Sequence, residues 1–143
     1  MTNISTIVIG VDGSEGSRRS TEFAATLAAQ LGARVIAVHV FEPLAHIADM
    51  APPYHFDEVE ARARVEAETT WTMPLRTAGV SFETRVLHGT PFDCIADTAR
   101  ETDADVIVVG ARGFSTLRGL ALGSTSNKLV HAAHRPVLVV PHP

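Results

Sequence analysis

The chain has 143 residues, of which 45% are hydrophobic and 20% charged, and its formal net charge is −4. This length suits one domain with one sizeable core, and the composition is that of a globular protein rather than a disordered one. The negative charge argues against a general nucleic-acid surface, which needs a basic stripe to neutralise phosphates.

The cysteine count and the hydropathy pattern bear on the compartment. A single cysteine, Cys94, cannot form an internal disulfide, so nothing indicates an oxidising environment. The first residues lack a basic segment followed by a long apolar run, and no apolar run approaches the roughly 20 residues that span a bilayer. We therefore expect a cytoplasmic protein that binds neither membranes nor nucleic acid.

Short β-branched runs alternate with segments of helical periodicity in the first half of the chain. A strand is predicted at 6–9, followed by a turn and by a helix that ends at Gly32. A second strand is predicted at 34–40, after which prolines make the segment 41–56 irregular. Residues 57–78 are expected to form a charged helix.

Proline is unfavourable inside that charged helix. Pro74 lacks a backbone donor, so the helix is expected to kink or end there. Its acidic residues are expected to face solvent, and Trp71 is expected to anchor it to the sheet.

The alternation continues in the second half of the chain. Strands are predicted at 82–87, 105–109 and 137–140, with helices at 91–102 and 124–134. Parallel neighbours in a sheet need crossover connections, and the predicted helices supply them. The sequence thus predicts an α/β fold, a five-stranded parallel sheet with helices on both faces.

Ligands of such sheets bind outside the carboxyl ends of the strands, near the point where the winding reverses. This rule gathers four segments of the chain at one edge: 10–14, 40–43, 88–91 and 110–124.

The last of these segments contains a glycine pattern that fits a phosphate cradle. Gly110 ends a strand, and Gly123 precedes a helix whose free N–H groups attract anions. Glycine at 110 and at Gly113 can adopt positive φ and lets a phosphate approach the backbone, while Ser124 and Thr125 offer hydroxyls. The alternative is that the glycines only turn the chain and that Ser124 caps the helix. Neither the P-loop nor the dinucleotide motif is present.

Four separated motifs accompany this pattern. They are "IVIGVDGSEGS" at 7–17, "VIAVHV" at 35–40, "HGTP" at 88–91 and "RPVLVVP" at 135–141. With the spacing G-x2-G-x9-G-S, the sequence resembles the universal stress protein family over essentially its whole length, so that residues 1–143 are expected to form a single domain. The glycines match the branch of the family that binds ATP.

The resemblance implies a Rossmann-like sheet of order 3-2-1-4-5, of the adenine nucleotide alpha hydrolase-like type, and ATP as the ligand, with Mg²⁺. It places the glycine segment and its two hydroxyls around the triphosphate, Asp12 at the ribose and the backbone of Val40 at the adenine edge. The expected binding residues are Gly10, Val11, Asp12, Val40, Gly89, Gly110, Arg112, Gly113, Gly123, Ser124 and Thr125.

Several polar residues in these segments also suit roles outside nucleotide binding. Asp12 fits the cap of the first helix, and Arg112 and Arg118 either clamp phosphates bidentately or lie in solvent. His131 and His134 could share a helix face, but two histidines without a third ligand are a weak metal signal.

Two further single residues suit packing better than chemistry. His39 lies within a predicted strand and is expected to be a satisfied interior residue. Cys94 is expected to be a small packed residue rather than a reactive thiolate. His88 falls near the expected site without a defined role.

Three functions fit these observations. The first is an ATP-binding regulatory protein of the stress response with at most slow hydrolysis, the second a nucleotide hydrolase or phosphotransferase, and the third a dimerisation module without nucleotide. The resemblance also implies a homodimer paired through 137–140, an apolar edge strand with unpaired backbone groups. Alternatively, Pro136 and Pro141 blunt that edge and the chain stays monomeric.

Overall fold

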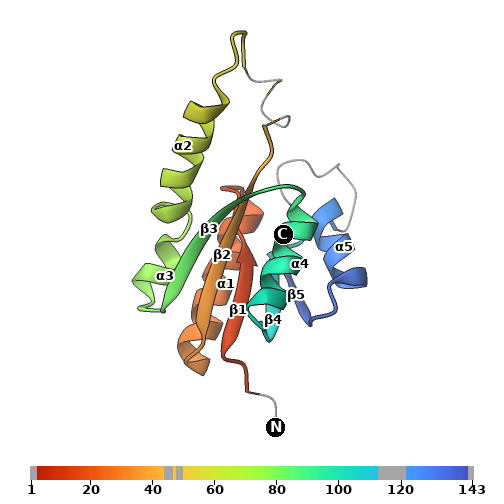
Figure 1. The fold of residues 1–143 in the computed structure, drawn as a ribbon. Coiled ribbons are helices and arrows are strands. Elements are labelled where there is room, and N and C mark those ends of the chain that lie inside the picture. The colour runs from red at the N-terminus through yellow and green to blue at the C-terminus, as the bar shows by residue number, and fades with distance from the viewer. Residues whose placement is uncertain (1–2, 44–46, 48–49, 113–121, 142–143) are drawn as a thin grey trace.

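The computed structural model describes residues 3–43, 47, 50–112 and 122–141. Its five strands form one parallel sheet in the order β3-β2-β1-β4-β5 (Figure 1). The fold class and strand order predicted above are thus confirmed. The strands are β1 (Thr6–Gly10), β2 (Arg34–Phe41), β3 (Phe82–His88), β4 (Val106–Gly110) and β5 (Val137–Val140).

Helices cover both faces of the sheet. The side chains of α1 (Glu15–Leu31) and α3 (Met73–Thr77) pack into one core cluster, and those of α4 (Pro91–Glu101) and α5 (Ser124–Ala132) into the other. The central strands β1 and β4 are buried between these layers, which explains their nearly continuous β-branched sequences. None of the described helices is long and apolar enough to cross a membrane.

The predicted helix at 57–78 is in fact two helices. The helix α2 (Phe56–Glu68) ends before Pro74, and the proline lies in the first turn of α3, where its missing donor costs no hydrogen bond. The chain between the helices is fixed by Trp71 N–H, which donates to Glu66 O at 2.9 Å, and by the Thr72 hydroxyl, which donates to Ala67 O at 2.9 Å.

The expected exposure of α2 is confirmed. Ala67 is its one buried residue, and in Figure 1 much of the helix rises above the carboxyl edge of the sheet.

Helix α1 approaches β4 closely through two glycines. A Cβ on Gly110 would lie 2.7 Å from Gly16 O, and a Cβ on Gly16 would lie 2.2 Å from Arg112 O. Both contacts are with backbone atoms, so a side chain at either position would force the helix away from the strand. The two glycines thereby place the first turn of α1 beside the carboxyl end of β4.

Candidate functional site

A pocket of about 170 Å³ opens at the carboxyl edge of the sheet. It lies where β1, β2 and β4 end and where α1 and α5 begin, beside the first turn of α4. This is the place at which the winding of the sheet reverses, because β1 has β2 on one side and β4 on the other. Most residues expected from the sequence line it: Gly10, Val11, Asp12, Val40, Gly110, Arg112, Gly123, Ser124 and Thr125.

One expected residue that the structure describes, Gly89, is not among the residues that line the pocket. Gly89 has φ of 135°, and a Cβ on it would lie 3.1 Å from Cys94 Sγ, so its glycine suits the turn before α4. Gly113, like Arg118, lies outside the described residues.

Other lining residues were not expected from the sequence, although strand ends and helix starts supply all of them. Ser14, Glu42 and Pro91 fall in the strand-end segments that topology pointed to, so they could have been included. Ser17, Ile95 and Ser126 lie within the first five residues of their helices, where no signal in the sequence indicated which side chains would face the pocket. The unexpected lining residues are Ser14, Ser17, Val38, His39, Glu42, Pro91, Ile95, Val109 and Ser126.

Asp12 is held in a tight hydrogen-bonded turn after β1. Its Oδ1 accepts from Ser14 N–H at 2.9 Å, and its own N–H donates to Ser17 Oγ at 3.1 Å. The cap of α1 is Ser14, whose hydroxyl accepts from Ser17 N–H at 3.1 Å. The alternative of Asp12 as the helix cap is therefore wrong, and the carboxylate stands at the pocket wall.

The three helices that begin at this edge differ in how their first N–H groups are satisfied. Ser14 caps α1, with the acidic Glu15 in its first turn, and Thr90 caps α4, with Asp93 in its first turn. In contrast, α5 begins after Gly123 with no side-chain cap and no acidic residue in its first turn. The first intrahelical bond of α5 is from Asn127 N–H to Gly123 O, so the preceding N–H groups have no partner within the helix. The alternative of Ser124 as a cap is also wrong.

Arg112 adds a cationic group to the same wall. Its Nε is buried and has no hydrogen-bond partner among the described residues. An anion in the pocket would supply the missing acceptor, and a guanidinium suits oxyanions because its N–H groups form a planar fork. The N–H groups at the start of α5, which have no partner within the helix, and this arginine therefore make one side of the pocket suited to negative charge.

The role expected for Gly110 needs a correction. The φ of Gly110 is not positive. The described glycines with positive φ are Gly13, Gly32, Gly79 and Gly89. Instead, the missing side chain of Gly110 admits the first turn of α1. Its carbonyl accepts a hydrogen bond from the Ser126 hydroxyl, which ties α5 to the end of β4.

On the β2 side, the backbone groups of Val40 have no hydrogen bond to the end of β1 among the described residues. Val38 O accepts from Val11 N–H at 2.9 Å, toward β1. Alternate residues of a parallel strand direct their N–H and C=O to the same side. The N–H and C=O of Val40 therefore face the space beyond the end of β1, and offer a donor and an acceptor side by side.

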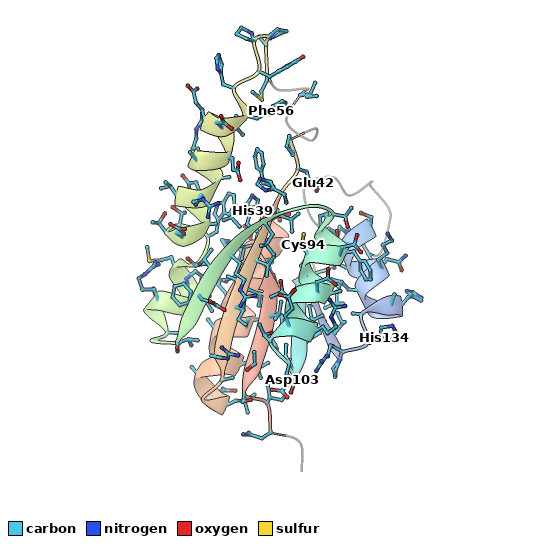
Figure 2. The ribbon with its side chains drawn as sticks, in the orientation of Figure 1. His39, Glu42, Phe56, Cys94, Asp103 and His134 are labelled. Carbon is cyan, nitrogen blue, oxygen red and sulfur yellow. The ribbon has the colours of Figure 1, made fainter. Side chains whose placement is uncertain are left out.

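His39 is a buried, satisfied residue, as expected. It is 8% exposed, and its Nδ1 lies 2.8 Å from Val11 O. Figure 2 shows it near the upper end of β2, below Glu42, which continues the chain past the strand.

The remaining titratable candidates show little sign of chemistry. Burial, followed by the charges of Asp93, Asp97 and Glu42, raises the pKa of the Cys94 thiol, which therefore stays protonated at neutral pH. His88 is exposed, and its Nε2 lies 2.6 Å from Glu60 Oε1, so this contact connects β3 to α2. Within the described part of the chain no three His, Cys, Asp or Glu residues are grouped so as to hold a metal ion.

Comparison with known proteins identifies the family. The model of the universal stress protein family matches residues 3–141, and the chain belongs to this family. It is 35% identical over 136 residues to a universal stress protein of Thermus aquaticus, covering 94% of this chain and 97% of that protein. It is also 31% identical to a universal stress protein of Mycobacterium tuberculosis, covering 98% of both chains.

Solved structures of this family share the fold, and some contain nucleotides. One, a universal stress protein in complex with cAMP, superposes with a TM-score of 0.76 at 28% identity and covers 98% of both chains. Another, from Archaeoglobus fulgidus in complex with dAMP, has a TM-score of 0.70 at 26% identity and covers 96% of this chain and 98% of that one. Nucleotides of adenine thus occur in structural neighbours of this chain.

Proposed function

We propose that the pocket binds ATP and that the protein is a nucleotide-dependent regulator of the stress response. The observation that carries this proposal is the uncapped start of α5 beside the buried Arg112 Nε, both on the wall of one pocket. The cAMP and dAMP complexes of structural neighbours support an adenine nucleotide as the ligand.

The phosphates would lie at the start of α5. There the N–H groups of Ser124 and Thr125 and the guanidinium of Arg112 are the donors, and the helix dipole adds favourable potential. Mg²⁺ would enter with the phosphates, because Mg²⁺ in nucleotide sites is bound by one or two carboxylates together with phosphate oxygens rather than by a protein cage. The described lining has two carboxylates, Asp12 and Glu42, and with Asp12 at the ribose it is Glu42 that would lie beside Mg²⁺.

The nucleoside would lie across the ends of β1 and β2. The carboxylate of Asp12 is an acceptor for ribose hydroxyls, and it is held by the turn to Ser14. The paired N–H and C=O of Val40 match the acceptor N1 and the donor N6 of adenine. This arrangement supports the assignment of Asp12 and Val40 made from the family resemblance.

A regulatory role is proposed ahead of an enzymatic one. Efficient phosphoryl transfer needs positioned metal ions, a cationic clamp and an oriented nucleophile. The described lining supplies one arginine and donors, while its histidine, His39, is engaged by a backbone carbonyl. We expect phosphate release far slower than the roughly 1 to 100 per second of kinases, and a steady-state assay with Mg²⁺ separates the two functions.

We further propose a cytoplasmic homodimer paired through β5. The strand is at the edge of the sheet and carries four half-buried apolar residues, whereas the opposite edge strand, β3, carries the pair Glu83 and Arg85 at 2.9 Å. Charges on an edge discourage pairing with another chain, and their absence permits it.

The phosphate assignment is tested by removing one arginine. Arg112→Ala is expected to weaken ATP binding about 10- to 100-fold, since a hydrogen bond to a charged group is worth about 1.5 to 3 kcal/mol. Arg100→Ala is the matched control, because Arg100 is an exposed residue of α4 that pairs with Asp97. Calorimetric titration with MgATP measures both. Equal affinity in the two folded variants would contradict a phosphate role for Arg112.

A further inference from the structure

Trp71 lies directly behind the pocket wall, although it does not line the pocket. It belongs to the short connection between α2 and α3 and is half-buried against the core cluster on the α1 face. Its backbone N–H donates to Glu66 O at 2.9 Å, and the next residue, Thr72, is fully buried. The backbone that carries the indole is therefore held in place within the α2–α3 connection.

The indole lies against the turn that holds Asp12. Gly13 has φ of 81°, and a Cβ on it would lie 2.7 Å from Trp71 Cε2 and 2.8 Å from both Cζ2 and Nε1. The ring thus occupies the space in which a side chain at position 13 would stand. Because Gly13 joins Asp12 to the helix cap Ser14, the indole limits how far the turn can move away from the pocket.

The same ring also supports the β2 side of the pocket. The ring centroids of Trp71 and His39 are 5.0 Å apart with an interplanar angle of 67°, an edge-to-face contact. The Nδ1 of His39 lies 2.8 Å from Val11 O, in the residue that precedes Asp12. Trp71 therefore contacts the turn at Gly13 directly. Through His39 it is also connected to Val11, the residue before the turn.

A second cavity lies on the far side of this turn. It has a volume of about 650 Å³ and lies between α1 and α3, with Trp71, Met73 and Pro74 on one wall. Gly13 lines it, and Ser14 and Ser17 line both this cavity and the pocket. Without the indole, the turn would face open space on one side and would lose its backing.

We propose that Trp71 is a positioning residue of the nucleotide pocket. It holds the turn 12–14 and His39 in place and thereby keeps the Asp12 carboxylate where the ribose hydroxyls of a bound nucleotide would lie. The proposal rests on the proposed function, and it adds that the α2–α3 connection helps to determine ribose recognition. A role in general packing alone would weaken all nucleotides equally, whereas positioning of Asp12 affects only nucleotides that carry ribose hydroxyls.

The test compares ATP with 2′,3′-dideoxy-ATP, which lacks both hydroxyls, by calorimetric titration. The wild type is expected to prefer ATP by about 10-fold or more, the size of one hydrogen bond to a carboxylate. Trp71→Ala is expected to bind the dideoxy nucleotide within about 2-fold of wild type while its preference for ATP falls toward unity. Trp71→Phe, which retains an aromatic ring, is expected to restore most of the preference.

Met73→Ala is the matched control, because Met73 is an exposed neighbour that lines the second cavity but not the pocket. Its preference for ATP is expected to equal that of the wild type. If Trp71→Ala does not fold, Trp71→Leu takes its place, since leucine keeps apolar volume at the connection but has no planar face for Gly13.

The outcomes separate the two proposals. A folded Trp71→Ala or Trp71→Leu variant that keeps the wild-type preference overturns the role of Trp71, and so does an equal loss of affinity for both nucleotides. A wild type that binds neither nucleotide at millimolar concentration overturns the proposed function itself.

Discussion

At the residue scale, the pocket wall after β1 is held by side chains that hydrogen-bond to the backbone of the same turn. Asp12, Ser14 and Ser17 form a closed set of hydrogen bonds around one turn. Of these, Asp12 was expected as a binding residue, Ser14 fell in the segment expected at this edge, and Ser17 was not foreseen. Sequence reasoning could place an aspartate after a strand at the ligand edge, because topology alone brings that position there. It could not choose between a cap and a ligand role, because that choice depends on which residue caps the helix, and the cap is Ser14, two residues later.

Asp105 offers a residue-scale prediction with a defined pH dependence. Its Oδ2 accepts from Ser5 N–H at 2.8 Å and from Thr6 N–H at 3.0 Å, and these bonds hold its pKa below the ordinary value of 3.8. A carboxyl group with a lowered pKa in the folded state contributes stability above its unfolded pKa and loses it as the pH falls through the folded pKa.

We therefore expect Asp105→Asn to lower the free energy of unfolding by about 1 kcal/mol at pH 7. The difference from the wild type should shrink as the pH falls below 3.8. Urea unfolding at several pH values measures it, with Asp97→Asn on the exposed face of α4 as the control. A difference that stays constant down to pH 2 would contradict the stated cause.

At the element scale, periodicity predicted the type of each element better than its ends. The helix predicted at 57–78 shows the reason: its polar pattern continues past residue 68, and Pro74 was the only local signal of a break. The chain turns earlier because Trp71 and Leu75 are packed against the α1 face, with Leu75 fully buried. Such long-range packing leaves no trace in local periodicity.

The contact between β4 and α1 leads to the second stability prediction. Gly110→Ala is expected to destabilise the fold by about 1 to 3 kcal/mol, because its Cβ would meet backbone atoms of Gly16 that cannot move without the helix. Gly10→Ala is the matched control, since its Cβ would meet the end of the Ile95 side chain at 3.0 Å, which can rotate. Urea unfolding compares the two, and an equal or smaller loss in Gly110→Ala would show that α1 is not held by this contact.

At the scale of the whole molecule, the sheet order was predicted from family resemblance and the parallel architecture from the alternation of strands and helices. The arrangement in space explains why one edge of the sheet carries the pocket: three strand ends and three helix starts meet there. It also places β5 at the edge of the sheet, paired with β4 alone among the described strands, and that free edge bears on assembly.

The backbone of β5 permits a direct test of the proposed dimer. Pro136 O and Val140 O accept hydrogen bonds from the β4 side, so the N–H of Val139 points to the free edge. A wild-type dimer should have a mass of about 31 kDa, twice the 15.3 kDa of the chain. Val139→Pro removes the outward donor without breaking the ladder to β4, and it should give a folded monomer.

Light scattering at micromolar concentration measures this mass, and circular dichroism checks the fold of the variant. Leu138→Pro serves as the contrast, because the N–H of Leu138 points to β4 and its loss should destabilise the chain itself. A wild type that is monomeric with and without ATP would rule out pairing through β5.

The central claim is that the pocket at the carboxyl edge binds an adenine nucleotide, and equilibrium dialysis of the wild-type chain against MgATP tests it most directly. We predict one ATP per chain with a dissociation constant between low micromolar and submillimolar, a range that corresponds to roughly 5 to 8 kcal/mol of binding free energy. A folded protein that retains no ATP at millimolar concentration would contradict the account.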